Sequence, residues 1–472
     1  MKIKMHHHHR AVLAIPAAAA IFLSVFAFLN SSDSLAQSEL SFSEVWARVE
    51  GNTPSEKAVK NELDAAVTGA ARASRHWFPV LYLDAKGYAS NDPGAALFSK
   101  LSQREISAAD FSPTLLNQPD AQLSERVALG VNFPLFEGGM RVAQTQIAQI
   151  QVQAKELEEK ATKNAIYLEV ARAYQSIAIQ ERATKGLHEL DKLLSDVLSR
   201  YHLGSKSNPV GYSGLLGLQG LKNKIMGSHA EKRAKISAYY GAITSMASGL
   251  PEKWTPRDSE LISFSQKYFT SVSGDSRAGD APTAARLGSL KFQSMEVASQ
   301  ASDRMVTLEK ARFLPRVGLF AESALNHGDR GTGVSHTAGA YLQFNLFSAS
   351  DYGAVHQAQS SSLAAHDRID EAKLHETIEV LANREATKAL EEGLRLLGDS
   401  SRLLAEQTEV AKKLFNSGAM NALQFAEVLN RRTDLLSALE NAEIEYLNAQ
   451  VVLSDHSGHS RIIQNKNGES HD

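Results

Sequence analysis

Histidine clusters are the first features of this sequence whose residue types could do chemistry. Four consecutive histidines at 6–9 could bind a metal or serve as a purification tag, and His456 and His459 could supply two further metal ligands. The first group precedes an apolar stretch with which it would be removed, and the second lies in a polar tail without supporting ligands. We therefore expect no metal site.

Glycine-rich and acidic stretches give equally little support for catalysis. The sequence GDRGTG at 328–333 lacks the strand-to-helix context of a phosphate-binding loop, so a hairpin loop is expected there. Glu158 and Glu159 are interpreted as solvated charges on a helix. No pairing of a nucleophile with a base stands out, so we expect neither an enzyme nor a bound cofactor.

The composition is that of a folded protein. Of the 472 residues, 43% are hydrophobic and 22% are charged. There is no cysteine, which excludes disulfides, thiolate metal sites and an acceptor for an N-terminal lipid. The formal net charge of −3 argues against nucleic acid as a partner.

Residues 1–36 have the pattern of a secretory signal peptide. Lys2, Lys4 and Arg10 flank the start, an apolar stretch runs from Ala11 to Leu29, and SLA at 34–36 matches a cleavage site. We expect export by a cleaved signal, without lipidation. Beyond residue 36 no apolar run approaches the ~18 residues of a membrane-spanning helix, so any crossing of a membrane would require strands.

The mature chain contains two copies of one pattern: a helix, two strands, a very long helix, a glycine turn and a returning helix. Three pairs of segments match: WFPVLYLDAKGY with FLPRVGLFAES, NFPLF with FNLF, and RYHLGSKSN with LFNSGAMNA. The predicted divisions are a first repeat at 37–250, an insert at 251–282, a second repeat at 283–453 and a polar tail at 454–472.

Long helices are predicted at 140–201 and 354–416, because both stretches are rich in helix formers and lack proline. At roughly 1.5 Å per residue each would be a rod of about 90 Å. Apolar residues spaced three and four apart, such as Leu187, Leu190 and Leu194, predict a coiled-coil seam. Returning helices are predicted at 209–249 and 421–453.

Glycines mark the ends of these rods. Gly204 and Gly418 are expected to be left-handed caps, either as ordinary turns of helix hairpins or as tips with a docking role. Glycine also recurs every third residue from Gly211 to Gly220, at a cost of about 1 kcal/mol each in a helix. The returning helix should therefore be locally mobile there or closely packed by another helix.

Strands are predicted at about 78–88, 126–136, 315–323 and 337–347, with 89–125 and 324–335 as loops. Apolar and polar residues alternate in them. In the last strand, one face carries Ala338, Ala340, Leu342, Phe344 and Leu346, and the other carries Thr337, Gly339, Tyr341, Gln343 and Asn345. This pattern suits a transmembrane barrel and equally a half-buried soluble sheet. Four strands cannot close a useful barrel, whereas three copies would supply twelve.

These features resemble the TolC-type outer-membrane efflux proteins. The resemblance lies in PLFEGG at 134–139 after an alternating strand, FLP at 313–315 after an Ala-rich helix, and the glycine turns. It extends over nearly all of residues 38–453. It implies a mainly α-helical homotrimer, with a twelve-stranded transmembrane β-barrel in outer-membrane lipid continued by a long α-helical coiled-coil tunnel through the periplasm.

The resemblance also implies a function and partners. Family members are exit ducts of tripartite efflux or type I secretion systems in Gram-negative outer membranes, and they do no chemistry themselves. An inner-membrane pump of the RND or ABC type drives them through a periplasmic adaptor (membrane fusion) protein. The alternative is that the chain is itself a periplasmic adaptor or spacer, although adaptors have one long hairpin rather than two; a secreted hydrolase is more distant.

Site residues follow from the resemblance. The barrel-to-helix transition falls at Pro134, Phe136, Gly138 and Gly139, where glycine permits a sharp change of backbone direction; the second copy, 348–353, lacks the glycine pair. The adaptor-docking tips fall at Leu203, Gly204, Ser205, Ser417, Gly418 and Ala419. The candidates for the aperture and its selectivity are Gln424, Glu427, Met420 and Lys206.

Glu427 is the strongest aperture candidate, because family members often place acidic residues shortly after the second tip glycine. Three copies of such a carboxylate would form a ring that binds cations. Gln424 departs from this pattern, since three amides would not bind cations as three carboxylates would. The alternative is that Glu427 is a solvated charge on a helix.

Overall fold

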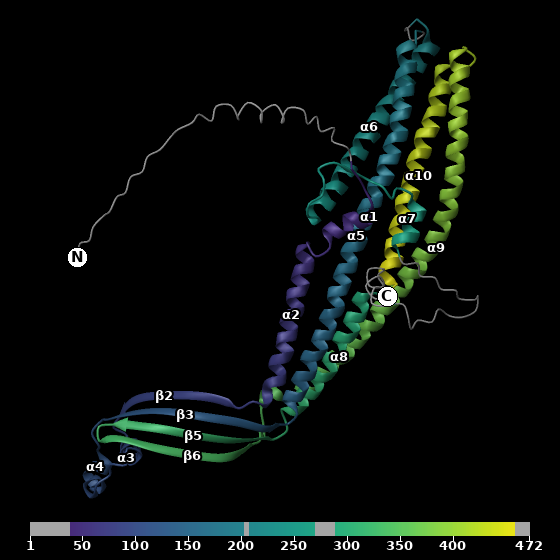
Figure 1. Cartoon of the computed structure of the whole chain (residues 1–472). Coiled ribbons are helices and arrows are strands. Elements are labelled where there is room, and N and C mark those ends of the chain that lie inside the picture. Colours follow the sequence, from purple (N-terminus) through teal and green to yellow (C-terminus); the bar gives the residue numbers. More distant parts are fainter. Residues whose placement is uncertain (1–37, 203–206, 270–287, 458–472) are drawn as a thin grey trace, which may run out of the picture.

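The protein is elongated, with a β-sheet at one end and long helices that run away from it (Figure 1). The computed structural model describes residues 38–202, 207–269 and 288–457. The signal segment, the part of the first predicted tip formed by residues 203–206, and His459 lie outside the described residues.

The two halves of the chain have the same order of principal elements, helix, two strands, long helix and returning helix. The first half contains β1 (Ser38–Leu40), α1 (Phe42–Val49), α2 (Pro54–Ser74), β2 (Val80–Ser90), α3 (Pro93–Ser102), α4 (Pro113–Asn117), β3 (Gln122–Glu137), α5 (Met140–Arg200) and α6 (Pro209–Met246). The second contains β4 (Trp254–Pro256), α7 (Leu261–Tyr268), α8 (Leu290–Ala311), β5 (Arg316–Gly328), β6 (Gly331–Gln343), α9 (Ala354–Asn416) and α10 (Ala422–His456).

The two long helices match their predicted bounds closely. Helix α5 has 61 residues and α9 has 63, and neither contains a proline. Helix α5 packs against α6 and α10, α9 packs against α10, and α2 and α8 lie along the sheet-proximal parts of the rods. The predicted seam of Leu187, Leu190 and Leu194 is fully buried. No helix in the described part of the chain is long and apolar enough to cross a membrane.

The four long strands form one antiparallel sheet in the order β2-β3-β5-β6. Directly paired residues share a face of such a sheet, and the register pairs Leu83 with Leu129 and Val127 with Leu325. The predicted alternation of apolar and polar residues is therefore confirmed, and the apolar residues of all four strands gather on one face.

The apolar face of the sheet is largely uncovered by the described residues. Leu81, Leu83 and Leu342 are each more than 70% exposed, and Leu129 is 62% exposed. The opposite face is polar and carries an ion pair between Arg126 and Glu322. A half-buried soluble sheet would have its apolar face covered, and no described part of this chain provides that cover.

The second hairpin is longer and tighter than the sequence predicted. The expected loop at 324–335 is mostly strand, because β5 continues to Gly328, β6 starts at Gly331, and only Asp329 and Arg330 form the turn. The GDRG stretch is thus a hairpin turn, as expected. Strand β6 ends at Gln343, so Phe344 and Leu346 lie beyond the strand to which they were assigned.

The described part of the predicted insert contributes to an aromatic core. Trp254, Phe264 and Tyr268 are buried together with Phe42 of α1 and Tyr174 of α5. These rings pack edge-to-face or stacked, with centroids 4.8–5.9 Å apart for Phe42–Tyr268 and Tyr174–Trp254. These residues lie where α1, β4 and α7 surround α5, midway along the rods. We call them the belt core.

The glycine-rich start of α6 is a continuous helix that packs closely rather than a break. Gly211 and Gly214 are buried, and a Cβ on Gly214 would lie 2.6 Å from the Cβ of Ala422. Glycine thus lets α6 approach the start of α10. Gly220 faces open space, so close packing explains only part of the glycine series.

Candidate functional site

The end of the α9–α10 hairpin is the better-described of the two predicted tips. Gly418 has a φ of 78°, the left-handed conformation that the sequence predicted. Its N–H donates to the carbonyl of Phe415 at 3.1 Å, and the N–H of Met420 donates to Leu414 at 3.1 Å. These bonds satisfy the last carbonyls of α9 and turn the chain back within five residues, leaving Ala419 exposed.

Ser417, Gly418 and Ala419 are all exposed at this turn. The Oγ of Ser417 donates to the carbonyl of Leu414 at 3.0 Å, which supports the turn. Met420 is half-buried against apolar residues of the tip rather than projecting freely. Their docking and aperture roles stay predictions.

Gln424 has a structural task at the start of α10. Its side-chain Oε1 accepts from the N–H of Asn421 at 3.2 Å, while Asn421 Oδ1 accepts from the N–H of Gln424 at 2.9 Å. This reciprocal pair is a capping box. The residue that departs from the family's acidic pattern is thus used to begin the helix.

Glu427 lies exposed one turn further along α10. Its Oε1 accepts from Nε of Arg431 at 2.9 Å, and the two side chains are 56% and 62% exposed. An exposed pair of this kind is worth at most about 1 kcal/mol, so the carboxylate can exchange this partner for another. Within one chain, Arg431 offsets the negative charge expected of an aperture ring.

The described residues that flank the first hairpin tip meet the second tip across a shared cleft. Leu203, Gly204, Ser205 and Lys206 lie outside the described residues, but both flanks of this tip are visible. The hydroxyl of Tyr201 donates to the carbonyl of Gly211 at 2.9 Å, and Asn208 caps α6. A cleft of 690 Å³ lies between the two hairpin ends, lined by residues that include Tyr201, Val210, Lys412, Phe415 and Met420.

An apolar cluster supports both tips from beneath. Phe415 stacks on Phe425 with ring centroids 4.9 Å apart, and Leu194 and Leu218 are fully buried in the same cluster. Helices α5, α6, α9 and α10 all contribute to it. The helix ends that lead to the two tips are therefore held together by this packing.

The strand-to-helix junction combines a bulge with two left-handed glycines. The β3–β5 register shifts between Pro134 and Phe136, which places Phe136 opposite Val317 on the apolar face. Gly138 and Gly139 follow with φ of 64° and 82°. Gly139 is the N-cap of α5, so the strand gives way to the helix at these two glycines.

Gly138 is required at this junction for a second reason. A Cβ there would lie 2.5 Å from the carbonyl oxygen of Ala311, at the end of α8. The passage from β3 into α5 therefore touches the passage from α8 into β5 at this point.

The second junction uses one glycine where the first uses two. Gly353 has a φ of 83° and is the N-cap of α9, which matches Gly139 at the start of α5. The missing glycine pair left this transition open in the sequence. The structure shows that the N-cap glycine alone suffices for the same left-handed entry into a long helix.

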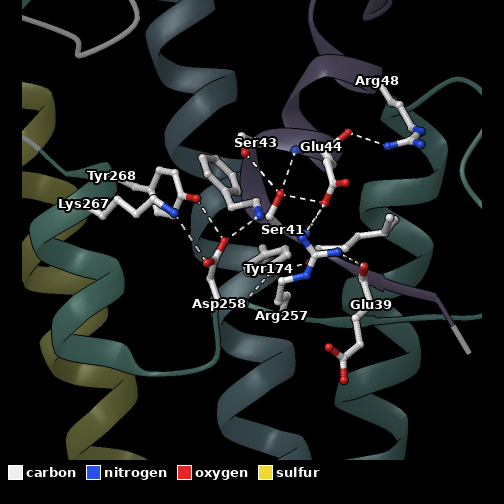
Figure 2. A network of polar contacts seen from close by, with 12 residues as sticks. Glu39, Ser41, Ser43, Glu44, Arg48, Tyr174, Arg257, Asp258, Lys267 and Tyr268 are labelled. Atoms are coloured by element: carbon white, nitrogen blue, oxygen red, sulfur yellow. Dashed lines mark hydrogen bonds and ion pairs between the residues drawn. The ribbon is translucent and has the colours of Figure 1, made fainter.

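Sequence reasoning missed a polar network that ties the belt core to β1 and the start of α1 (Figure 2). Asp258 accepts from the N–H of Phe42 at 2.9 Å and from the hydroxyl of Tyr268 at 2.9 Å. The hydroxyl of Tyr174 donates to Leu40 at 2.7 Å and accepts from the N–H of Asp258 at 3.0 Å. Burial raises the pKa of Tyr174, so this hydroxyl stays protonated and available as a donor.

A buried ion pair inside the rods was also missed. Lys232 of α6 pairs with Glu440 of α10, and their side chains are only 6% and 4% exposed. Gln180 of α5 donates to the other carboxylate oxygen at 2.7 Å. In the sequence, the only sign of this pair is a charged residue at a seam position of each helix. Hydrophobic periodicity alone does not show that these two residues meet.

His456 is not in a polar tail, as the sequence suggested, because α10 continues to it. It is buried, and its Nε2 lies 3.0 Å from Glu379 of α9. Within residues 38–202, 207–269 and 288–457, no three His, Asp or Glu side chains gather as a metal site would require.

Comparisons of sequence found nothing, since no protein-family model and no curated protein matches this chain. Comparison of folds is informative. The Campylobacter jejuni CmeC outer membrane channel superposes with a TM-score of 0.72 at 14% identity, covering 91% of this chain and 89% of that one. Vibrio cholerae VceC, an outer membrane protein, gives 0.69 at 14% identity and covers 89% and 96%.

The open state of the Neisseria gonorrhoeae MtrE outer membrane channel gives a TM-score of 0.69 at 13% identity, covering 88% of each chain. Each of these matches covers at least 88% of this chain. This chain therefore has the fold of the TolC-type outer-membrane efflux proteins.

Proposed function

We propose that this protein is an outer-membrane exit duct that passively conducts substrates delivered by an inner-membrane pump and a periplasmic adaptor. Three copies close their sheets into a twelve-stranded barrel in lipid, and their rods continue the bore through the periplasm. The duct does no chemistry. The apolar sheet face, with Leu81, Leu83 and Leu342 more than 70% exposed, is the observation that carries this proposal.

The unpaired edges of the sheet give the second support. Strands β2 and β6 each pair on one side only within the described residues. An open edge is not tolerated in lipid, because unpaired N–H and C=O groups have no water to bind there. Pairing β2 of one copy with β6 of the next satisfies both edges and closes the cylinder at three copies.

The docking and aperture roles belong to the same proposal. The exposed turn at Ser417, Gly418 and Ala419, together with Leu203, Gly204 and Ser205, would receive the adaptor. Glu427, with Gln424 and Met420 near it in the chain and Lys206 from the other hairpin, would line the periplasmic opening. The alternative of an adaptor is not favoured, since the chain has two long helix hairpins and matches channels over most of its length.

Pairs of engineered cysteines test the closure cleanly, because the native sequence has no cysteine. Leu83→Cys on β2 would be combined in turn with Ala338→Cys, Ala340→Cys or Leu342→Cys on β6 and oxidised in intact cells. We expect covalent dimers and trimers in the outer-membrane fraction for at least one pair. Each single-cysteine variant is the control.

A soluble periplasmic species that is monomeric and gives no crosslinked ladder with any of the pairs would overturn the proposal. Adaptor docking is tested separately, with crosslinkers attached at Ser417→Cys and, as a control far from the tip, at Ser299→Cys in α8. We expect an adaptor to be crosslinked to the Ser417→Cys variant and not to the Ser299→Cys variant.

A further inference from the structure

The segment that joins β2 to β3 is folded rather than an open loop. Helix α3 begins after Asp92, whose Oδ1 accepts from the N–H of Ala95 at 2.8 Å. Helix α4 follows at Pro113, and the whole segment gathers at the end of the sheet far from the rods (Figure 1). We call residues 91–121 the cap. The sequence alone predicted only a loop here.

A buried ionic cluster holds the cap together and ties it to the β5–β6 turn. Asp110 accepts from Nζ of Lys100 at 3.0 Å and from Nη2 of Arg330 at 2.9 Å. Its side chain is 1% exposed and that of Lys100 is 9% exposed. Hydrogen bonds from the N–H of Ser107 and from Lys100 hold the pKa of Asp110 well below its usual range, so this carboxyl group stays ionised and able to accept both bonds.

Gln103 makes a second attachment to the same turn. Its Oε1 accepts from the N–H groups of Arg330 at 2.9 Å and Gly331 at 3.1 Å, and its Nε2 donates to Ser99 at 2.9 Å. Gln103 is itself 3% exposed. The side-chain amide of Gln103 therefore takes the place of water as the hydrogen-bond partner of the backbone N–H groups in this turn.

Glycines in the hairpin let the cap approach its backbone. A Cβ on Gly333 would lie 2.2 Å from the carbonyl oxygen of Ser102, and one on Gly328 would lie 2.4 Å from Nε2 of Gln103. Any side chain at these positions would push the cap away. The contact is thus built into the strands as well as into the cap.

The register shows which face of the sheet the cap covers. Gly328 and Gly333 have the same parity along β5 and β6 as Glu322 and Thr337, which belong to the polar face. A Cβ atom added at either position would point at the cap. The cap therefore lies on the polar side of the sheet, opposite the exposed apolar face.

From this placement we infer that the cap is a constriction inside the outer end of the bore, latched to the barrel wall through Asp110, Gln103 and Arg330. The inference rests on the proposed function, because the polar face becomes the lumen only when the barrel closes. Three copies then carry three caps within one mouth. The cap is a second narrow point, at the end opposite the periplasmic tips.

The free side of α3 gives this constriction an apolar lining. Ala96, Ser99 and Lys100 face the hairpin, whereas Phe98 and Leu101, on the opposite side of the helix, are 67% and 41% exposed. With α3 held against the wall, these two side chains point away from it into the bore. Apolar constrictions impede ions more than their width alone would, because they lose water readily.

Conductance in planar lipid bilayers tests the inference directly. Replacing residues 91–121 by Asn-Gly joins the paired ends Ser90 and Gln122 through a two-residue turn. We expect trimers with a single-channel conductance about twofold higher than that of the unaltered protein. Unchanged conductance in a folded trimer would overturn the inference while leaving the proposed duct intact.

A point variant of the latch tests the same inference without deleting the cap. Asp110→Asn leaves Lys100 buried without its carboxylate, so we expect the cap to open intermittently, seen as added high-conductance steps and faster amide exchange across 93–117. Asp120→Asn, an exposed acid in the same segment, is the matched control and should change neither. Conductance steps identical in both variants, despite faster exchange in Asp110→Asn, would also count against the constriction. Absence of any pore in the unaltered protein would instead remove the proposed function.

Discussion

The belt core and the β-sheet are stabilised in opposite ways. In the belt core, Phe42, Tyr174 and Phe264 are at most 1% exposed, and the chain completes its own apolar packing there. In the sheet, the ladder hydrogen bonds are formed but Leu81 and Leu83 stand more than 70% exposed. The belt core is therefore packed within one chain, whereas no described residue covers the apolar face or the two edges of the sheet.

The largest expected effect comes from breaking the belt core. Tyr174→Ala removes a fully buried ring and two hydrogen bonds, so we expect the free energy of unfolding to fall by about 4 kcal/mol. The measurement is urea unfolding in detergent followed by helical circular dichroism. Tyr352→Ala, at a side chain that is 90% exposed, should shift the midpoint little; equal losses in both variants would contradict the contrast.

A charge on the apolar sheet face should act on insertion and leave the helices intact. Leu83→Arg places a cation where lipid is expected, at a cost of about 3 kcal/mol near the middle of a bilayer. We expect fewer trimers in the outer membrane, measured by fractionation, with unchanged helical circular dichroism. Thr337→Arg on the polar face is the control, and equal insertion of both variants would argue against a lipid-facing surface.

Close packing at the tips is tested by adding one methyl group. Gly214→Ala forces a Cβ into contact with Ala422 and should destabilise the protein by about 2 kcal/mol. Gly220→Ala, at a position that faces open space, should stabilise α6 by up to about 1 kcal/mol. Opposite shifts of the unfolding midpoint are the expected result, and shifts of one sign would show that α6 does not approach α10 closely at Gly214.

The smallest stability effect is expected at Glu427. Glu427→Gln removes one exposed ion pair with Arg431, so the unfolding free energy should change by less than about 0.5 kcal/mol. If Glu427 lines the opening, the same variant should lower the preference of the pore for cations, measured as a reversal potential in a salt gradient. An unchanged reversal potential would leave Glu427 as a solvated helix charge.

The sequence by itself determined the elements and their order. Runs without proline set α5 and α9, alternation set the two faces of the sheet, and Gly418 set the left-handed turn between α9 and α10. These features depend on the conformational preferences of a few neighbouring residues, so a local pattern is enough to predict them.

Only the tertiary structure decided which distant residues meet. The pairing of Lys232 with Glu440, the bonds of Asp258 to the start of α1, and the docking of the cap on Gly333 join segments far apart in the chain. The residues next to a buried charge or a closely packed glycine in the sequence do not show which distant residue it contacts. Its partner follows from how the helices and strands pack, because burial makes an unmatched polar group costly and leaves one arrangement that satisfies it.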